Sequence, residues 1–329
     1  MTQKHISKIG VAALAGAALF ATSSAFAAPT TVQMFSIADS WHNLGSGNIK
    51  TTTPNGGATA NHSNDTAEVC VFCHTPHGGD SGAAVPIWNR TLGDPNSYTR
   101  YSSLGTSTFD AEEAPIGSVT IACLSCHDGT QAIDSVLNAP GSGGWTGSAA
   151  RIGTDFVGSD QTNGLLAANI VQNLGTDLSN DHPVSMQYAG GGVNTGNPDG
   201  PTNDRDFVAG SNPVPHPQSF TLNNAAAPQG GGITRLWWIE RNGDSLNPAA
   251  RDREDVILYT RVETGTGNAE IDNIEQPFVE CGSCHDPHNI ENPTFLRVSN
   301  GVPADSTSGF PLANGGPSGL CLTCQIGRP

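Results

Sequence analysis

CLSCH, at Cys123–His127, is the stretch that decides the fold: two cysteines three positions apart, with a histidine directly after the second. The same pattern occurs as CVFCH at Cys70–His74 and as CGSCH at Cys281–His285. A fourth stretch, GLCLTCQ at Gly319–Gln325, has both cysteines but a glutamine in place of the histidine. All eight cysteines of the chain fall in these four pairs.

Three kinds of chemistry use paired cysteines, and the histidines and the spacing discriminate among them. A disulfide framework is common in exported proteins, but it gives no reason for a histidine after every second cysteine. Zinc ribbons place two pairs roughly 15–20 residues apart, whereas residues 74–122, 127–280 and 285–320 separate the pairs here. Cys-x-x-Cys-His is the attachment signature of c-type haem. Two thiols on one helical turn reach the two vinyl groups at one edge of the porphyrin, and the histidine then lies under the iron.

The pattern therefore predicts three covalent c-type haems, with His74, His127 and His285 as their proximal iron ligands. The cofactor-binding cysteines are Cys70, Cys73, Cys123, Cys126, Cys281 and Cys284, together with Cys321 and Cys324 for a fourth haem. Three alternatives stay open at the fourth pair: a haem ligated by a histidine from elsewhere, a haem with an open or weakly bound iron, or two bare cysteines. We favour an attached fourth haem because both cysteines and the surrounding GLCLTC are intact.

Residues 1–27 have the features of a secretory signal peptide. Lys4 and Lys8 form a basic start, Ile9–Phe20 form an apolar run too short to span a membrane, and Ala25–Ala27 form a small-x-small cleavage signal. We expect residues 28–329 to form a single multihaem domain that is exported, extracellular or at the cell surface, and alternatively periplasmic. No second apolar run of spanning length follows, so we do not expect an integral membrane protein.

The composition predicts an unusual fold. The chain has 40 glycines, 22 prolines and only 6% aromatic residues, which leaves few side chains for a core. We expect mostly irregular coil with short helices and a few short strands, organised around covalently bound haems. The clearest strand signal is a hairpin over residues 233–262, from ITRLWWIE and DVILYTRV. The net charge of −16, with Lys50 the only lysine after the signal peptide, argues against binding to nucleic acid or to anionic membranes.

Histidines are the expected second ligands of the iron. Beyond residue 27 the only methionines are Met34 and Met186, so bis-histidine ligation is favoured over histidine–methionine ligation. CHTPH and CHDPH place His77 and His288 three residues beyond a proximal histidine, too close to reach the far face of the same haem. We expect these two to ligate neighbouring haems. The candidates for the metal sites are thus His42, His62, His77, His182, His216 and His288, and for His62 and His216 the choice between ligand and surface residue stays open.

These phrases carry a family resemblance. HNLG, VCVFCHTPH, PIWNR, CLSCHDG, LSNDHPVS, CGSCHDPHN, FLRVSN and GLCLTCQ, in this order, resemble the exported tetrahaem c-type cytochromes of metal-respiring bacteria, above all those that polymerise into extracellular filaments. The resemblance implies a coil-rich fold around a continuous chain of bis-histidine haems. It implies His42, His77, His182 and His288 as distal ligands and His62 or His216 as a ligand between subunits. The family has a histidine at the position of Gln325, which puts the fourth site in doubt.

Iron with two histidine ligands has no open position for a substrate, so we predict an electron carrier and not an enzyme. The expected partners are copies of the chain in an electron-conducting filament, other cytochromes, and extracellular metal oxides or electrodes. One alternative is a multihaem reductase whose fourth haem is open, although the sequence shows no cluster of catalytic Arg, Lys or Tyr. A soluble monomeric electron shuttle is the other alternative.

Overall fold

The structure is a computed structural model that describes residues 37–48, 50, 59–107, 109–139, 156–209, 216–222, 234–241, 255–290, 292–298 and 319–324. These residues belong to one compact unit, Phe35–Pro329. The predicted signal peptide, Met34 and Gln325 lie outside the described residues. No helix in the described part of the chain is long and apolar enough to span a membrane.

Irregular segments joined by short elements make up most of this unit, which confirms the predicted coil-rich fold with short helices and a few short strands. The helices are α1 (Ser118–His127), α2 (Cys281–Cys284) and α3 (Gly319–Cys324), with 3-10 turns η1 (Ile37–Asp39), η2 (Cys70–Phe72), η3 (Pro95–Ser97), η4 (Tyr101–Leu104), η5 (Tyr188–Gly190) and η7 (Pro293–Phe295). The strands are β1 (His62–Ser63), β2 (Phe156–Val157), β3 (Gln161–Thr162), β4 (Leu165–Leu166), β5 (Met186–Gln187), β6 (His216–Thr221), β7 (Arg235–Glu240), β8 (Val256–Val262) and β9 (Glu275–Val279).

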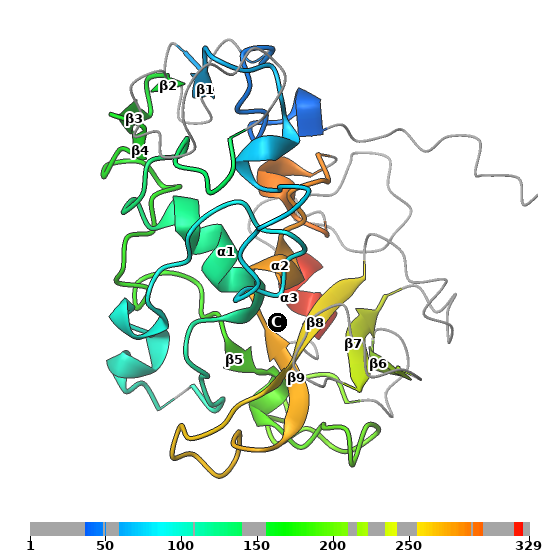
Figure 1. Ribbon diagram of the computed structural model, residues 1–329. Helices are drawn as coiled ribbons and strands as arrows, with labels where there is room; N and C mark the ends of the chain where they lie inside the picture. Colours follow the sequence, from blue (N-terminus) through cyan, green and yellow to red (C-terminus); the bar gives the residue numbers. More distant parts are fainter. Residues whose placement is uncertain are drawn as a thin grey trace, which may run out of the picture. The chain divides into compact units, whose positions relative to one another are not determined.

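An antiparallel sheet of five strands, in the order β5-β9-β8-β7-β6, is the largest regular element. The predicted strand pair is confirmed: β7 and β8 are antiparallel, with Trp237 opposite Leu258. The sequence did not predict β6 or β9, each of which contains a proline, Pro217 and Pro277, that argues against a central strand. In Figure 1 this sheet lies below α1 and α2, and the small ladders β1–β2 and β3–β4 lie at the opposite end.

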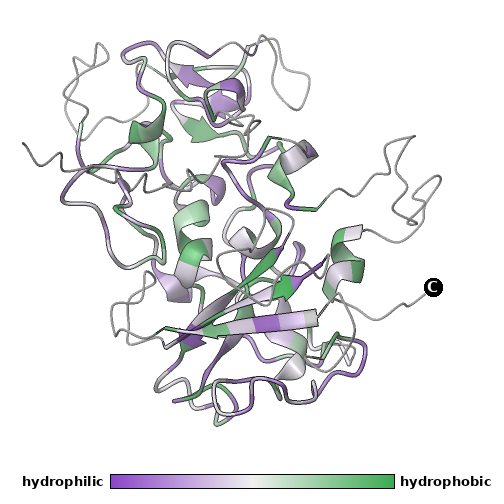
Figure 2. Ribbon diagram, turned by 90° about the vertical axis from the view of Figure 1, so that its right-hand side faces the viewer, coloured by the Kyte–Doolittle hydropathy of each residue, from purple (hydrophilic) through white to green (hydrophobic). Residues whose placement is uncertain are grey.

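Two main apolar clusters stabilise the unit. The first surrounds α1, whose hydrophobic colouring is visible in Figure 2, and consists of Ala83, Trp88, Tyr98, Ile116, Ile121, Ala122, Leu124 and Leu178. The second covers one face of the sheet and consists of Tyr188, Ala189, Val193, Trp237, Ile239, Val256, Leu258 and Val298, with Leu320 and Cys324 of α3 packed against it. The helix α1, which carries Cys123 and Cys126, is therefore anchored in the first cluster, and α3, which carries Cys321 and Cys324, is anchored in the second.

Candidate functional site

Each of the four cysteine pairs lies on a single helical turn. The pair Cys123/Cys126 is inside α1, and Cys281/Cys284 forms the ends of α2. In the first motif the amide of His74 donates to the Cys70 carbonyl at 2.8 Å, which closes the turn around η2. Residues three apart on a helical turn share one face, so both thiols of a pair are presented to the same side.

The cysteines of different motifs lie beside one another. None of the eight is joined in a disulfide. A hydrogen bond between the thiols of Cys123 and Cys281 raises the pKa of Cys123 and lowers that of Cys281. Burial raises the pKa of Cys73 to about 12, and the nearby Cys126 acts in the same direction. Cysteines of the first, second and third motifs thus lie close to one another.

The three motif histidines share one hydrogen-bonding arrangement. His74 Nδ1 lies 2.8 Å from the Pro86 carbonyl oxygen, His127 Nδ1 lies 2.8 Å from that of Gln172, and His285 Nδ1 lies 2.7 Å from that of Thr294. A carbonyl oxygen can only accept, so Nδ1 carries the hydrogen and donates it. The lone pair is then on Nε2, the arrangement in which a protein holds a histidine for a metal.

Two of these histidines lie opposite a histidine from a distant part of the chain. The ring centroids of His127 and His42 are 6.1 Å apart, with 65° between the ring planes. The centroids of His74 and His288 are 6.3 Å apart, with 19° between the planes. Each pair therefore consists of one motif histidine and one histidine that is distant from that motif in the sequence.

The spacing within both pairs fits a metal ion between the rings. A metal–nitrogen bond of about 2 Å and a ring radius of about 1.1 Å place two imidazole centroids facing across an ion about 6.2 Å apart. The observed 6.1 and 6.3 Å agree with this value. Either angle between the planes is compatible with two imidazole ligands, because an imidazole can take any rotation about its bond to a metal. The donor sets thus suit iron with two axial imidazoles.

The two histidines opposite the motif histidines differ in environment, because His42 is surrounded by protein groups whereas His288 is exposed. Burial lowers the pKa of His42 to about 3, the nearby His127 and His288 act in the same direction, and a hydrogen bond to the Pro287 backbone opposes them. His42 is consequently neutral at physiological pH, as a metal ligand must be. His288 Nδ1 lies 3.5 Å from Asp286 Oδ1. Burial opposes ionisation of Asp286, but the hydrogen bond from His288 and the charge of Arg297 lower its pKa to about 2.

The first and third motifs repeat the same local structure. In the first, the Asn89 amide donates to the Cys73 carbonyl at 2.8 Å, and His74 is bridged to Trp88. In the third, the Arg297 amide donates to the Cys284 carbonyl at 2.9 Å, and His285 is bridged to Leu296. A short return segment, residues 86–89 in one case and 294–297 in the other, supplies the carbonyl that holds the motif histidine. The repeated phrases CHTPH and CHDPH were the only sequence sign of this repeat.

Left-handed backbone marks both return segments. Ile87 has φ 47°, and Thr294 and Phe295 have φ 56° and 61°. Such values are unfavourable for β-branched and bulky residues and are found where the surroundings fix the conformation. Here they occur beside the carbonyls that accept the Nδ1 hydrogens of His74 and His285. The strained residues therefore lie in the two segments that orient His74 and His285.

The other predicted iron ligands, His62, His77, His182 and His216, are not part of these two histidine pairs. His77 and His182 are exposed, and neither is stacked on another described histidine. His62 is partly buried in β1, and its Nδ1 lies 2.9 Å from the Ala60 carbonyl oxygen. His216 begins β6, and its side chain lies outside the described residues.

Arg90 is a site residue that sequence reasoning missed. It is fully buried and donates five hydrogen bonds to four carbonyl oxygens. Ser125, between the cysteines of the second motif, accepts from Nε and Nη2, and the other acceptors are Ala132, Ile133 and Ser135. The phrase PIWNR contains Arg90, but nothing in its letters shows that the guanidinium is buried. The neighbouring Trp88 has its ring edge-on to His74 at 5.7 Å and donates to Ser125 Oγ.

Glu280 joins the second and third motifs in a similar way. Its side chain is buried and accepts from Thr120 Oγ1 at 2.6 Å, Ser185 Oγ at 2.9 Å and Arg261 Nη1 at 2.8 Å. Burial raises its pKa, against the charge of Arg261 and the hydroxyl hydrogen bonds. Thr120 belongs to α1 and Glu280 directly precedes α2, so this network fixes one attachment helix against the other.

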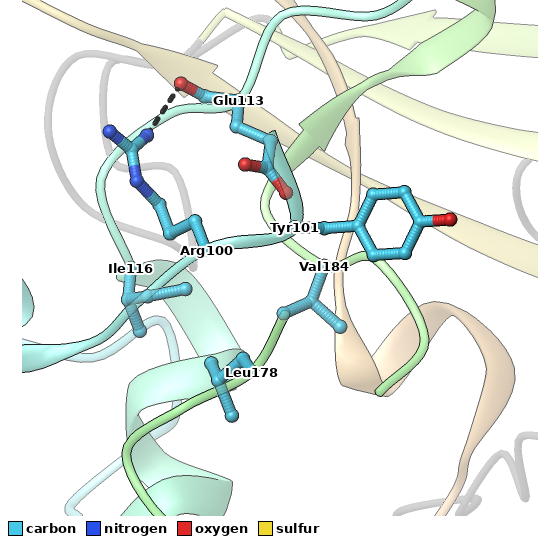
Figure 3. Close-up of a pocket in the computed structure, with 6 residues that line it drawn as sticks. All are labelled: Arg100, Tyr101, Glu113, Ile116, Leu178 and Val184. Atoms are coloured by element: carbon cyan, nitrogen blue, oxygen red, sulfur yellow. Dashed lines mark hydrogen bonds between the residues drawn. The ribbon is translucent and has the colours of Figure 1, made fainter. Parts of the chain in front are cut away.

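Two pockets lie away from the cysteine motifs. The pocket in Figure 3 is formed by Arg100, Tyr101, Glu113, Ile116, Leu178 and Val184, and Arg100 Nη1 donates to the Glu113 carbonyl oxygen at 2.8 Å. A larger pocket of about 540 Å³ adjoins it, with Glu112, Glu113 and Glu263 in its wall. No histidine or cysteine lines either pocket. The described residues contain no group of three or more His, Cys, Asp or Glu that could hold a bare metal ion.

No protein-family model matches the chain, and no curated protein matches it significantly.

Proposed function

We propose that this chain is a multihaem c-type cytochrome that transfers electrons between closely spaced bis-histidine haems. The observation that carries the proposal is the pairing of His42 with His127 and of His74 with His288 at 6.1 and 6.3 Å, each beside a Cys-x-x-Cys turn. When bound, haem supplies a one-electron carrier whose potential depends on its axial ligands and its burial.

The chain's residues would hold the cofactor in three ways. The cysteine pairs supply thiols for covalent attachment on one face of a turn. The main-chain carbonyls of Pro86, Gln172 and Thr294 keep Nδ1 protonated and leave Nε2 to the iron. His42 would supply the second imidazole ligand at the second motif and His288 at the first, which would leave no open coordination position for a substrate there.

Close contact between motifs supports electron transfer between sites. The Cys123 and Cys281 thiols lie close enough that each shifts the pKa of the other. Burial raises the pKa of Cys73, and the nearby Cys126 raises it further. Thioether bonds at these sulfurs would put neighbouring porphyrin edges near one another. His288 follows the third motif but lies beside His74 of the first, which fits ligation between neighbouring sites.

A fourth haem at Cys321 and Cys324 is part of the proposal. Both cysteines lie on α3, and burial raises the pKa of Cys324, with Cys284 of the third motif acting in the same direction. The Val208 amide donates to the Cys324 carbonyl at 2.9 Å, which anchors α3 to the irregular segment at residues 201–209. The iron ligands there would come from histidines outside the motif.

Assembly into an extracellular electron-conducting filament is the finer part of the proposal. It rests on the family resemblance and on the surplus of histidines. His62 fits a ligand between subunits, because its Nδ1 is bonded to the Ala60 carbonyl and its Nε2 keeps the lone pair. A head-to-tail contact that does not close generates an open fibre. Other cytochromes and extracellular metal oxides would exchange electrons with it.

The first test is the number and spin state of the haems in the exported protein. We expect intact-mass measurement to show four attached haems and the ferric absorption spectrum to be low-spin. Cryo-electron microscopy of the same material is expected to show filaments with an unbroken haem chain. Absence of covalent haem would overturn the cytochrome proposal, and discrete particles would overturn the filament. Mostly high-spin iron that binds cyanide or nitrite would favour a reductase.

A further inference from the structure

The two histidine pairs differ in the angle between their rings. The planes of His74 and His288 are 19° apart, close to parallel, whereas those of His42 and His127 are 65° apart, closer to perpendicular. This angle matters for low-spin ferric iron. Each imidazole donates π electron density perpendicular to its own ring, into one of two iron d orbitals of similar energy.

Nearly parallel rings raise the same d orbital and separate the two in energy. Rings closer to perpendicular raise one orbital each and leave the two nearly equal, which makes the magnetic response of the iron strongly anisotropic. The orientation of axial ligands is set by groups around the iron that contact them. The question is therefore which residue holds His42 at its angle.

Phe295 is in contact with His42. The two ring centroids are 4.4 Å apart and the planes are within 6° of parallel, so the rings are stacked. Stacked aromatic pairs contribute roughly 0.5–1.5 kcal/mol beyond the area that they bury. A stacked ring also resists rotation of its neighbour, because rotation separates the faces.

The backbone of Phe295 is fixed in turn. Phe295 and Thr294 have φ 61° and 56°, and the Phe295 carbonyl accepts from the Asp286 amide at 2.8 Å. The Thr294 carbonyl accepts from His285 Nδ1. One strained turn, Pro293–Phe295, thus contacts a histidine of the third motif through its main chain and His42 through a side chain.

We propose that Phe295 is a positioning residue that fixes the ring plane of His42, and that the haems at the first and second motifs are therefore electronically distinct. This inference rests on the proposed function. The return segment of the third motif sets the ligand plane at the second motif. The equivalent position in the first motif is Ile87, which has no ring to stack.

Electron paramagnetic resonance of the fully oxidised holoprotein tests the inference. We expect a rhombic low-spin signal from the His74–His288 iron and a strongly anisotropic signal with a large maximum g value from the His42–His127 iron. His42→Met should remove the anisotropic signal and leave the rhombic one, which assigns the anisotropic signal to the second motif. His288→Ala should remove the rhombic signal of the His74–His288 iron, which assigns that signal to the first motif. A single rhombic class would overturn the inference and leave the cytochrome proposal intact, whereas no low-spin ferric signal would overturn the cytochrome proposal itself.

Phe295 variants test the positioning role. Phe295→Leu should move the anisotropic signal toward the rhombic form, and Phe295→Tyr should preserve it because the ring is kept. The matched control is Phe109→Leu, whose ring packs on Tyr101 at 5.4 Å, and it should change neither signal. The rhombic signal reports that each variant is folded. An unchanged anisotropic signal in folded Phe295→Leu would overturn the positioning role of Phe295. If only Phe295→Tyr yields folded protein, loss of the anisotropic signal in that variant would overturn the role.

Discussion

The guanidinium of Arg90 donates to the carbonyl oxygen of Ser125 from two nitrogens, Nη2 at 2.8 Å and Nε at 3.2 Å. Ser125 lies between the two cysteines of the second motif, and Arg90 follows the segment that holds His74. A single buried side chain therefore ties the first attachment site to the second.

Arg90→Lys is expected to destabilise the protein although it keeps the charge. Lysine has three donors for the five hydrogen bonds that Arg90 makes, so buried carbonyls lose their partners, at a cost of about 2–4 kcal/mol in the free energy of unfolding. Guanidinium unfolding of the holoprotein measures this cost. The exposed Arg205 provides the control, because Arg205→Lys should change the value by less than about 0.5 kcal/mol. Equal effects at both positions would contradict the assigned role of Arg90.

Glu280→Gln should weaken the contact between α1 and α2. The substitution removes the buried charge that pairs with Arg261 and is expected to cost about 3 kcal/mol of stability. Glu263 pairs with the same arginine at 2.7 Å in a more exposed position, and Glu263→Gln should cost about 1 kcal/mol or less. Thermal unfolding of the two variants side by side gives the comparison, and the reverse order of stabilities would show that the network does not depend on Glu280.

Gly79→Ala should displace the segment that orients His74. A Cβ at this position would lie 2.6 Å from the Ile87 carbonyl carbon and 2.8 Å from the Trp88 carbonyl oxygen, both main-chain atoms. We expect a loss of about 2 kcal/mol in unfolding free energy and a change in the spectrum of the iron bound by His74. A Cβ at Gly47 meets nothing within 4 Å, so Gly47→Ala is the control. A native spectrum and stability for Gly79→Ala would mean that the segment adapts.

His288→Ala should convert one haem from low-spin to high-spin. The lost imidazole is the ring opposite His74, so the affected iron belongs to the first motif although His288 follows the third. Resonance Raman spectra of the ferric protein measure the spin state. His288→Met separates ligand loss from misfolding, because a thioether keeps the iron six-coordinate and raises the potential. Low-spin iron throughout in His288→Ala would disprove the pairing.

The sequence predicted what depends on local pattern. β7 and β8 were predictable because β-branched and aromatic residues are concentrated in two runs between turn-rich segments. Trp237 and Trp238 of β7 are both buried. β9 was not, because Pro277 argues against a strand and its place in the sheet depends on β8. The motif cysteines and histidines were identified as candidates from their spacing, and their cofactor stays a proposal.

The partners of those histidines were harder to predict for a physical reason. His288 meets His74, and Phe295 meets His42, only because the chain folds back over more than two hundred residues, which no local pattern encodes. The burial of Arg90 and Glu280 was equally hidden, since charged residues are ordinarily exposed. The sequence therefore identifies candidate residues for each site but not the residues that lie beside them in the fold.

Main-chain carbonyls, rather than side chains, hold the three motif histidines, and this affects which substitutions related sequences can tolerate. Replacing Pro86, Gln172 or Thr294 changes a side chain but leaves the accepting oxygen in place, provided that the backbone keeps its path. At residue 294 the left-handed φ makes asparagine or glycine the best-suited replacement. Sequence variation at Pro86 and Gln172 should therefore be wide, and an alignment that scores residue identity alone would miss these positions as parts of the site.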